Sequence, residues 1–263
     1  MNRNRFGLLG ERLAHSFSPF IHAELGDYEY RLYEKKPDEL DDFFRYGNFD
    51  GLNVTIPYKK DVIRYCRSLS ETARINGSVN TITRFADGSL YGDNTDYFGF
   101  AYLLKKAGLN CFEGKTIVLG SGGSSLTVQA VLKDMNAPEV IIISRNGTDN
   151  YENIWKHSDA QIIINTTPVG MYPNSGCSPI KDFGIFKRCR AVVDLIYNPA
   201  RTELLMQAEE RGILCANGLA MLVAQAKKSA EYFTNSPIDD EKIEAIISNA
   251  ALRVGTNSVR PPT

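Results

Sequence analysis

The sequence predicts an α/β protein with two domains, one of them built on a parallel sheet that helices cover on both faces. Strand-like and helix-like segments alternate along almost the whole chain. The 263 residues, 43% of them apolar, suffice for two modest hydrophobic cores. Residues 115–125 indicate a buried strand that enters a glycine turn and opens a helix.

The first hundred residues show this alternation clearly. Expected strands lie at 5–9, 28–33, 51–55, 79–84 and 89–91, and expected helices at 19–25, within 37–46 and at 58–66. The last two strands are separated by Ala86-Asp87-Gly88, a turn sequence that favours a hairpin. A helix over 96–107 follows, with its apolar side chains on one face and Gly108 as its C-terminal cap, and we interpret it as the bridge between the domains.

The second half continues the pattern with more apolar strands. Further strands are expected near 140–144, 161–165, 191–195 and 213–216, and helices at 126–135, 202–211, 219–233 and 239–252, before a tail at 253–263. Such repeated strand–helix units are typical of a parallel sheet buried on both faces.

Composition excludes several classes of partner. Thirty basic and 31 acidic residues give a net charge of −1, which offers no general attraction for nucleic acid or an anionic membrane. The five cysteines are scattered and form no C-x-x-C, so neither a disulfide framework nor a metal site is indicated. No apolar run reaches membrane-spanning length and no apolar segment follows the first residues, so we expect a cytoplasmic protein with a small-molecule ligand.

The glycine turn is the first candidate binding site. Gly120, Gly122 and Gly123 allow close approach of a ligand, and the N-terminus of the following helix attracts phosphate. This arrangement holds the pyrophosphate of a dinucleotide in a Rossmann-like doubly wound domain. Ser125 stands where the third glycine of G-x-G-x-x-G belongs, so the motif alone also fits an ordinary strand-to-helix turn.

Ser16 and Ser18 form a second candidate site, in the segment His15-Ser-Phe-Ser-Pro19. A serine at the N-cap with proline at the first helical position is a common helix start. The same hydroxyls, next to a helix N-terminus, can also bind a substrate carboxylate. Pattern alone favours the capping role.

Neutral hydrogen-bonding residues recur where segments of the first hundred residues end, as in Asn80-Thr81 and Asn94-Thr95-Asp96. Each can be a helix cap, and Lys59, just past Thr-Ile-Pro, can be an ordinary solvated lysine. Taken together they favour a polyhydroxylated ligand.

These segments, in this order, resemble the shikimate dehydrogenase family over nearly the whole chain. The matching motifs are Gly10 with His15-Ser-Phe-Ser-Pro19, Gly51-Leu-Asn-Val-Thr-Ile-Pro-Tyr-Lys59, Gly77-Ser-Val-Asn-Thr81, Gly92-Asp-Asn-Thr-Asp96, Gly120-Ser-Gly-Gly123, Asn165-Thr-Thr-Pro-Val-Gly-Met171, Asp194-Leu-Ile-Tyr-Asn-Pro199 and Gly218-Leu-Ala-Met-Leu222 with Gln225.

The resemblance implies an N-terminal α/β substrate domain at 1–101, completed by helices at 218–252, and an NADP-binding domain at 102–217, with the active site in the cleft between them. It implies catalytic roles for Lys59 and Asp96. It further implies substrate ligands at Ser16, Ser18, Thr55, Asn80, Tyr197 and Gln225, and cofactor contacts at Gly120, Gly122, Gly123, Ser144, Arg145, Asn146, Thr166, Gly218 and Met221.

The implied reaction is the reversible, NADP-dependent reduction of 3-dehydroshikimate to shikimate in the biosynthesis of aromatic amino acids, without a metal, in a monomer or homodimer. Two alternatives stay open: a quinate-preferring relative, and a non-catalytic relative that binds the same ligand. The first is modestly disfavoured by the Ser-x-Ser pair, and the second by the presence of both Lys59 and Asp96.

Three positions depart from the family pattern. Arg12 and Asn76 replace a usual proline and an apolar residue and are expected to affect packing only. Ser144-Arg145-Asn146 replaces Asn-Arg-Thr in the loop that sets cofactor choice. Arg145 can pair with the 2′-phosphate of NADP or be a solvated loop residue. The usual second basic residue after it is missing, since the loop continues to Asp149, so a weaker preference for NADP is expected.

Overall fold

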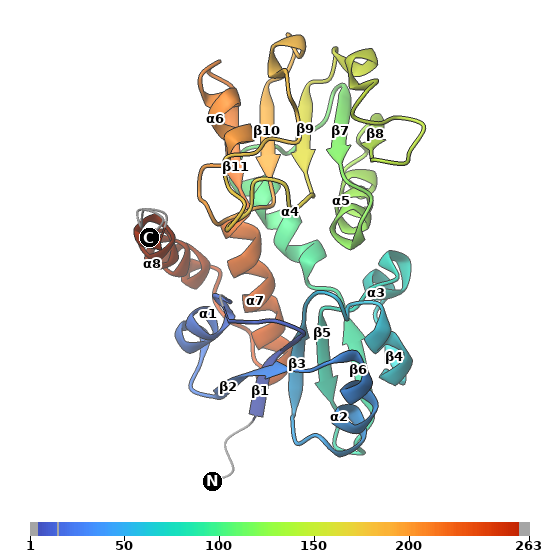
Figure 1. Ribbon diagram of the computed structural model, residues 1–263. Coiled ribbons are helices and arrows are strands. Elements are labelled where there is room, and N and C mark those ends of the chain that lie inside the picture. Colours follow the sequence, from blue (N-terminus) through green and yellow to red (C-terminus); the bar gives the residue numbers. More distant parts are fainter. Residues whose placement is uncertain (1–4, 15, 258–263) are drawn as a thin grey trace. The chain divides into compact units, whose positions relative to one another are not determined.

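A computed structural model describes residues 5–14 and 16–257, with side chains up to residue 253 (Figure 1). His15 of the expected serine motif and residues 258–263 of the expected tail lie outside this part. The chain divides into two compact units: unit 1 comprises residues 1–99 and 223–246, and unit 2 comprises 100–222 and 247–263.

Unit 1 contains a mixed six-stranded sheet in the order β2-β1-β3-β5-β6-β4. The elements are β1 (Arg5–Gly10), α1 (Ser18–Leu25), β2 (Glu29–Glu34), α2 (Leu40–Tyr46), β3 (Gly51–Val54), β4 (Ser68–Leu69), α3 (Glu71–Asn76), β5 (Thr81–Arg84) and β6 (Leu90–Asp93), with 3₁₀ turns at Pro37–Glu39 and Asp61–Tyr65. The antiparallel pairing of β5 with β6 confirms the expected hairpin. Its core includes the fully buried Leu9, Leu52 and Ile82.

Unit 2 contains a five-stranded parallel sheet in the order β11-β10-β9-β7-β8. Its strands are β7 (Lys115–Leu119), β8 (Glu139–Ile143), β9 (Ile162–Asn165), β10 (Ala191–Asp194) and β11 (Leu214–Asn217), and its helices α5 (Gly123–Asp134) and α6 (Glu203–Glu209). Strand order reverses at β7, whose two neighbours are β8 and β9. In doubly wound sheets ligands bind beyond the carboxyl ends of the strands at this reversal.

Helices pack on the sheet of unit 2, because α5 contacts β7 while α6 contacts β10 and β11 (Figure 1). Side chains alternate along the strands as a doubly covered sheet requires. One core cluster, which includes residues of α6, contains Ile117, Leu119 and Val192. The alternate residues Val118 and Val193 are also buried but do not belong to this cluster. The prediction of a parallel sheet is confirmed.

Three long helices contain the boundaries between the units. Unit 1 ends within α4 (Asp96–Lys106), resumes within α7 (Leu219–Thr234) and ends again within α8 (Glu241–Asn257). The expected tail at 253 was wrong in part, because α8 continues to Asn257; its sequence lacks proline there, and Leu252 and Arg253 favour helix. Within the described part of the chain, no helix has both the length and the apolar character to cross a bilayer.

The expected helix over residues 58–66 was also wrong, since this segment forms turns and the short 3₁₀ helix at Asp61–Tyr65. An α-helix would require the Lys59 carbonyl to accept from the amide four residues later. Here that carbonyl accepts instead from the Val79 amide at 2.7 Å. Lys59 is thereby hydrogen-bonded to the segment that leads into β5 rather than to its own next turn.

Candidate active site

Lys59 and Asp96 form an ion pair in unit 1. The distance between Lys59 Nζ and Asp96 Oδ2 is 2.6 Å, with 26% and 13% of the side chains exposed. Lys59 lies in the turn that follows β3. Asp96 is the first residue of α4, and its backbone amide donates to Asn94 Oδ1 at 3.2 Å. Asn94 thus supplies a capping acceptor, which leaves the Asp96 carboxylate free for the lysine.

Asn80 joins this pair to a residue far along the chain. Its Nδ2 donates to Asp96 Oδ1 at 3.0 Å and lies 3.4 Å from Gln225 Oε1. Asn80 is 3% exposed and precedes β5, while Gln225 lies on α7. Four of the residues singled out in the sequence are therefore linked by direct contacts within one unit.

Behind Asn80 lies a buried cluster of polar side chains that sequence reasoning did not assign to the site: Asn53, Thr81, Thr95 and Ser229. Each is at most 5% exposed. Asn53 Nδ2 donates to Ser229 Oγ at 2.8 Å, and the two threonine hydroxyls lie 2.8 and 3.0 Å from the same oxygen. One signal existed in the sequence, because Asn53 interrupts an otherwise apolar strand.

The capping interpretation of Ser18 was wrong. Helix α1 begins at Ser18 itself, its N-cap residue is Phe17, and no side chain caps the helix. Ser16 Oγ accepts from the Ser18 amide at 3.2 Å. The Ser18 side chain hydrogen-bonds Tyr30, whose pKa is raised by burial and by the nearby Tyr28, and this bond opposes the rise.

Tyr30 connects the serines to the buried cluster, since its hydroxyl donates to Asn53 Oδ1 at 2.8 Å.

Thr55, at the end of β3, is half-buried, and its amide donates to the Leu9 carbonyl at 2.9 Å. Tyr197, the remaining predicted substrate ligand, belongs to unit 2, where burial raises its pKa.

The glycine turn of unit 2 has the backbone that a phosphate site needs. Gly120 has a φ of 104°, and a Cβ there would stand 2.7 Å from Thr166 Oγ1. Gly122 is the N-cap of α5 without a side-chain cap, and a Cβ at Gly122 or Gly123 would meet nothing within 4 Å. The first turn of α5 therefore faces open space at the strand-order reversal.

Thr166 and Ser125 have structural partners in this turn. Thr166 Oγ1 donates to the Leu119 carbonyl at 2.6 Å and so holds the end of β9 against the end of β7. Ser125, at the position of the missing third glycine, is fully buried and accepts from Gln129 Nε2 at 3.1 Å. Its small hydroxyl is accommodated where the motif usually has no side chain.

The loop after β8 presents Arg145 and Asn146 to solvent, with Ser144 half-buried. Among the described residues Arg145 forms no ion pair. The carboxylate of Asp149, which follows in the same loop, contacts His157 Nε2 at 2.9 Å. Arg145 is thus available to an anion, and Asp149 is engaged elsewhere.

Asp194 is a fully buried carboxylate at the end of β10. It accepts hydrogen bonds from Thr202 Oγ1 at 2.7 Å, Asn165 Nδ2 at 3.0 Å and the Ile196 amide at 3.0 Å. Burial raises its pKa to about 6, and the three hydrogen bonds oppose that rise. Sequence reasoning assigned it no role, although it sits inside the motif that contains Tyr197.

Gly218 and Met221 lie where β11 leads into α7. The Gly218 amide donates to the Ile196 carbonyl at 3.0 Å, so this turn packs directly against the segment after Asp194. Met221 is 9% exposed.

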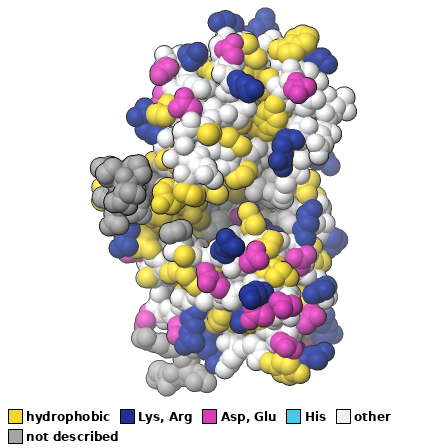
Figure 2. Space-filling view, in the orientation of Figure 1, with side chains coloured by type: hydrophobic (Ala, Val, Ile, Leu, Met, Phe, Trp, Pro, Cys, Tyr) yellow, Lys and Arg dark blue, Asp and Glu magenta, His cyan; other side chains and the backbone are white. Residues whose placement is uncertain are grey.

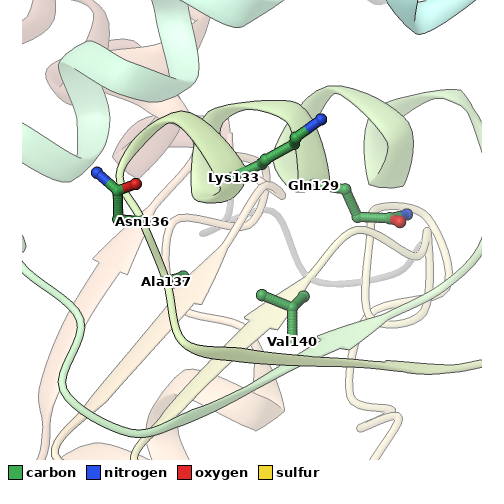
Figure 3. Close-up of a pocket in the computed structure, with 5 residues that line it drawn as sticks. All are labelled: Gln129, Lys133, Asn136, Ala137 and Val140. Atoms are coloured by element: carbon green, nitrogen blue, oxygen red, sulfur yellow. The ribbon is translucent and has the colours of Figure 1, made fainter.

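A hollow of about 580 Å³ lies elsewhere in unit 2, against α5 and the start of β8 (Figure 3); its lining residues are Gln129, Lys133, Asn136, Ala137 and Val140. The polar ends of Lys133, Gln129 and Asn136 point in different directions in Figure 3, so they form no convergent binding group. The glycine turn is at the other end of the sheet.

Surface charge and possible metal ligands add no further site. Lys and Arg side chains alternate with Asp and Glu over the visible face, without a large area of one sign (Figure 2). Within residues 5–14 and 16–253, no group of three or more His, Cys, Asp or Glu side chains is arranged to hold a metal ion.

Comparison with known proteins identifies the relatives of this chain. Residues 8–82 match the family model described as the shikimate dehydrogenase substrate binding domain. A shikimate dehydrogenase (NADP(+)) from Clostridium perfringens is 33% identical over 94% of this chain and 98% of its own length.

Solved structures agree with this relationship. A chorismate mutase/shikimate 5-dehydrogenase fusion protein from Clostridium acetobutylicum superposes with a TM-score of 0.90 at 35% identity, covering 97% of this chain and 100% of that one. Shikimate 5-dehydrogenase from Thermus thermophilus, in complex with NADP(H) and shikimate, gives 0.80 at 28% identity over 94% and 99%. These likenesses confirm the predicted α/β fold with a Rossmann-like unit.

Proposed function

Since this chain belongs to the shikimate dehydrogenase family, we propose that it catalyses the reversible, NADP-dependent reduction of 3-dehydroshikimate to shikimate. The observation that carries the proposal is the Lys59–Asp96 ion pair at 2.6 Å, with the Asn80 amide on the second carboxylate oxygen. An acid–base pair braced by a neutral amide suits the reduction of a ketone in a polyhydroxylated ring.

Unit 1 is proposed to bind the substrate and unit 2 the cofactor. Ser16 and Ser18 would bind the substrate carboxylate, while Thr55, Asn80 and Gln225 would bind ring hydroxyls. Tyr197 would add a contact from unit 2. Support for the serines comes from their place at the start of α1, where Ser18 lies in the first turn and its side chain does not cap the helix. Ser16 Oγ accepts from the Ser18 amide and can still donate its proton.

The residues of unit 2 fit NADP. The uncapped first turn of α5, with open space at Gly122 and Gly123, suits the pyrophosphate. Arg145, with Ser144 and Asn146 beside it, would bind the 2′-phosphate, and Thr166, Gly218 and Met221 would line the rest of the site. Asp149, which follows in the same loop, has a partner of its own, since its Oδ1 lies 2.9 Å from His157 Nε2.

In the proposed reaction the cofactor, when bound, supplies the hydride. Lys59, as an ammonium, stabilises the negative charge that develops on the ketone oxygen and donates the proton that completes the hydroxyl. Asp96 holds the ammonium in place and accepts a hydrogen bond from the same hydroxyl. In the reverse direction Lys59, as the neutral amine, accepts the hydroxyl proton.

The test is a steady-state assay of purified protein with 3-dehydroshikimate and NADPH, followed by loss of the NADPH absorbance band. We expect turnover, and we expect shikimate with NADP to give the reverse signal. Quinate in place of shikimate distinguishes the quinate-preferring alternative, which the names of the relatives described above do not favour. Binding of shikimate without any turnover would overturn the proposal and favour a non-catalytic role.

We also propose that the reaction takes place in the cytoplasm. All five cysteines are free thiols, which is the state that a reducing compartment maintains. Whether the protein is a monomer or a homodimer stays a prediction to be tested by sedimentation.

A further inference from the structure

The Asn80 amide can have only one orientation. Its Oδ1 accepts from the Thr95 backbone amide at 2.7 Å and lies 3.0 Å from Thr81 Oγ1 and 3.2 Å from Thr95 Oγ1. A rotation by 180° would place the Asn80 NH₂ against the Thr95 N–H, donor against donor. The same rotation would place the amide oxygen against the Asp96 carboxylate, so the observed orientation is strongly favoured.

The hydroxyl protons behind Asn80 can be assigned by elimination. Ser229 Oγ donates to the Gln225 carbonyl at 3.0 Å, so its oxygen serves the cluster as an acceptor. Asn53 is oriented too, because its Oδ1 accepts from Tyr30 and its NH₂ therefore faces Ser229. The nearest acceptors for the two threonine protons are Ser229 Oγ and Asn80 Oδ1; Thr95 Oγ1 also lies 3.1 Å from Thr81 Oγ1 and 3.5 Å from Gln225 Oε1.

These bonds form two branches that start at the Asn53 amide, which accepts from the Tyr30 hydroxyl. One branch runs through Ser229 Oγ and ends at the Gln225 carbonyl. The other runs from Asn53 Nδ2 to Thr81 Oγ1 at 3.3 Å and continues in one direction through the Asn80 amide to Asp96. Donors that point the same way polarise one another, and buried networks of this kind gain most when every member is satisfied. The carboxylate at the end of the second branch is the partner of Lys59.

We propose that Thr81, Thr95 and Ser229 are positioning residues, which fix the Asn80 amide so that its NH₂ holds the Asp96 carboxylate on Lys59. None of them touches the Lys59 ammonium, and all three are at most 2% exposed. The two threonine hydroxyls contact Asn80 Oδ1 directly, and Ser229 acts on Asn80 through them. This inference deepens the proposed function and rests on it for its kinetic consequences, but its structural claim concerns the Asn80 amide alone.

The chain offers a matched control in Thr83, on the same strand as Thr81. The Thr83 hydroxyl is buried and has no hydrogen-bond partner among the described residues. Thr83→Val therefore removes a hydroxyl of the same kind from the same strand without touching the cluster. Thr95→Ser keeps the hydroxyl and serves as the rescue variant.

In the assay of 3-dehydroshikimate reduction, we expect Thr95→Val and Thr81→Val each to lower kcat about threefold to tenfold with little change in KM, the range for one neutral hydrogen bond. Ser229→Ala should fall in the same range. Thr95→Ser should restore kcat, and Thr83→Val should match wild type. Equal kcat in Thr95→Val and Thr83→Val would overturn the inference.

A second measurement does not depend on turnover. The ¹⁵N relaxation of the Asn80 side-chain NH₂ should show an ordered amide in wild type and Thr83→Val, and a more mobile one in Thr95→Val and Ser229→Ala. An equally ordered amide in all four proteins would overturn the positioning role even if the enzyme is active. Absence of turnover in wild type would instead contradict the proposed function, while the amide measurement would still decide this inference.

Discussion

Gly218 lies so close to Leu195 that a Cβ at position 218 would stand 2.0 Å from the Leu195 carbonyl oxygen. The contact joins the turn before α7 to the segment that follows Asp194. No rotamer can relieve such a clash, because the carbonyl belongs to the backbone and the position of a Cβ is fixed by the backbone that carries it.

Gly218→Ala should therefore force the two segments apart and destabilise the protein by about 1 to 3 kcal/mol or more, as overpacking of a close-packed contact does. Thermal unfolding measures the loss. Gly122→Ala is the control, since a Cβ there meets nothing within 4 Å, and its melting temperature should stay near that of wild type. Equal stability of the two variants would show that the turn relaxes without cost.

Lys59→Ala should lower kcat by about 10² to 10⁴, the span of a positioned acid–base group, with a much smaller effect on shikimate binding. The lysine acts where negative charge develops, so its loss is felt mainly in the transition state. Lys60→Ala is the matched neighbour, exposed to solvent, and should be nearly silent. A decrease below tenfold in kcat for Lys59→Ala would make the lysine a bystander.

Arg145→Ala should weaken NADP by about one to two orders of magnitude and leave NAD almost unchanged, because charge-assisted hydrogen bonds contribute roughly 1.5 to 3 kcal/mol. The kcat/KM values for both cofactors, with wild type and variant, measure the effect. The expectation fails if wild type prefers NAD, or if the variant loses both cofactors equally.

Asp194 should make stability depend on pH. Its pKa is about 6 in the folded protein against 3.8 for an ordinary aspartate, so the unfolded chain gives up this proton first as pH rises. The contribution is fully present below pH 4 and is lost as pH rises through 6, by about 3 kcal/mol in all.

The measurement is the free energy of unfolding of wild type and Asp194→Asn from pH 4 to pH 7.5. The neutral amide can still accept from Asn165 and Ile196, while the Thr202 hydroxyl can turn to receive its NH₂. Stability of wild type relative to the variant should fall with rising pH. A constant difference across this range would mean that Asp194 titrates normally.

The strands of unit 2 could be predicted because each is a short apolar run between turn residues, and the parallel sheet followed from their spacing.

Helix α3 was missed although its signals are present: Ser70 caps it, accepting from the Ala73 amide at 3.0 Å, and Gly77 ends it with a φ of 57°. The helix has only six residues with little apolar periodicity, so the signals at its two ends were not enough to predict it.

The candidate site shows a second kind of feature that sequence patterns do not predict, namely contacts between residues far apart in the chain. Lys59, Asn80 and Asp96 stand out in the sequence because polar residues recur where its predicted segments begin and end. Thr81 and Thr95 lie in the same polar segments, but their cluster with Asn53 and Ser229 could not be predicted, because Asn53 and Ser229 are 176 residues apart and meet only when α7 packs on β3. Sequence patterns report local structure, whereas this contact exists only in the folded unit.

That separation has a consequence for synthesis on the ribosome. Residues 1–99 emerge long before α7, yet unit 1 needs Phe233 to stack on Phe6 at 4.6 Å and Ser229 to accept from Asn53. A nascent chain that ends before residue 223 thus exposes an incomplete sheet face and an Asn53 that lacks its 2.8 Å partner Ser229. Unit 2, whose core comes from one continuous segment, has all of its strands by residue 217 and can close first.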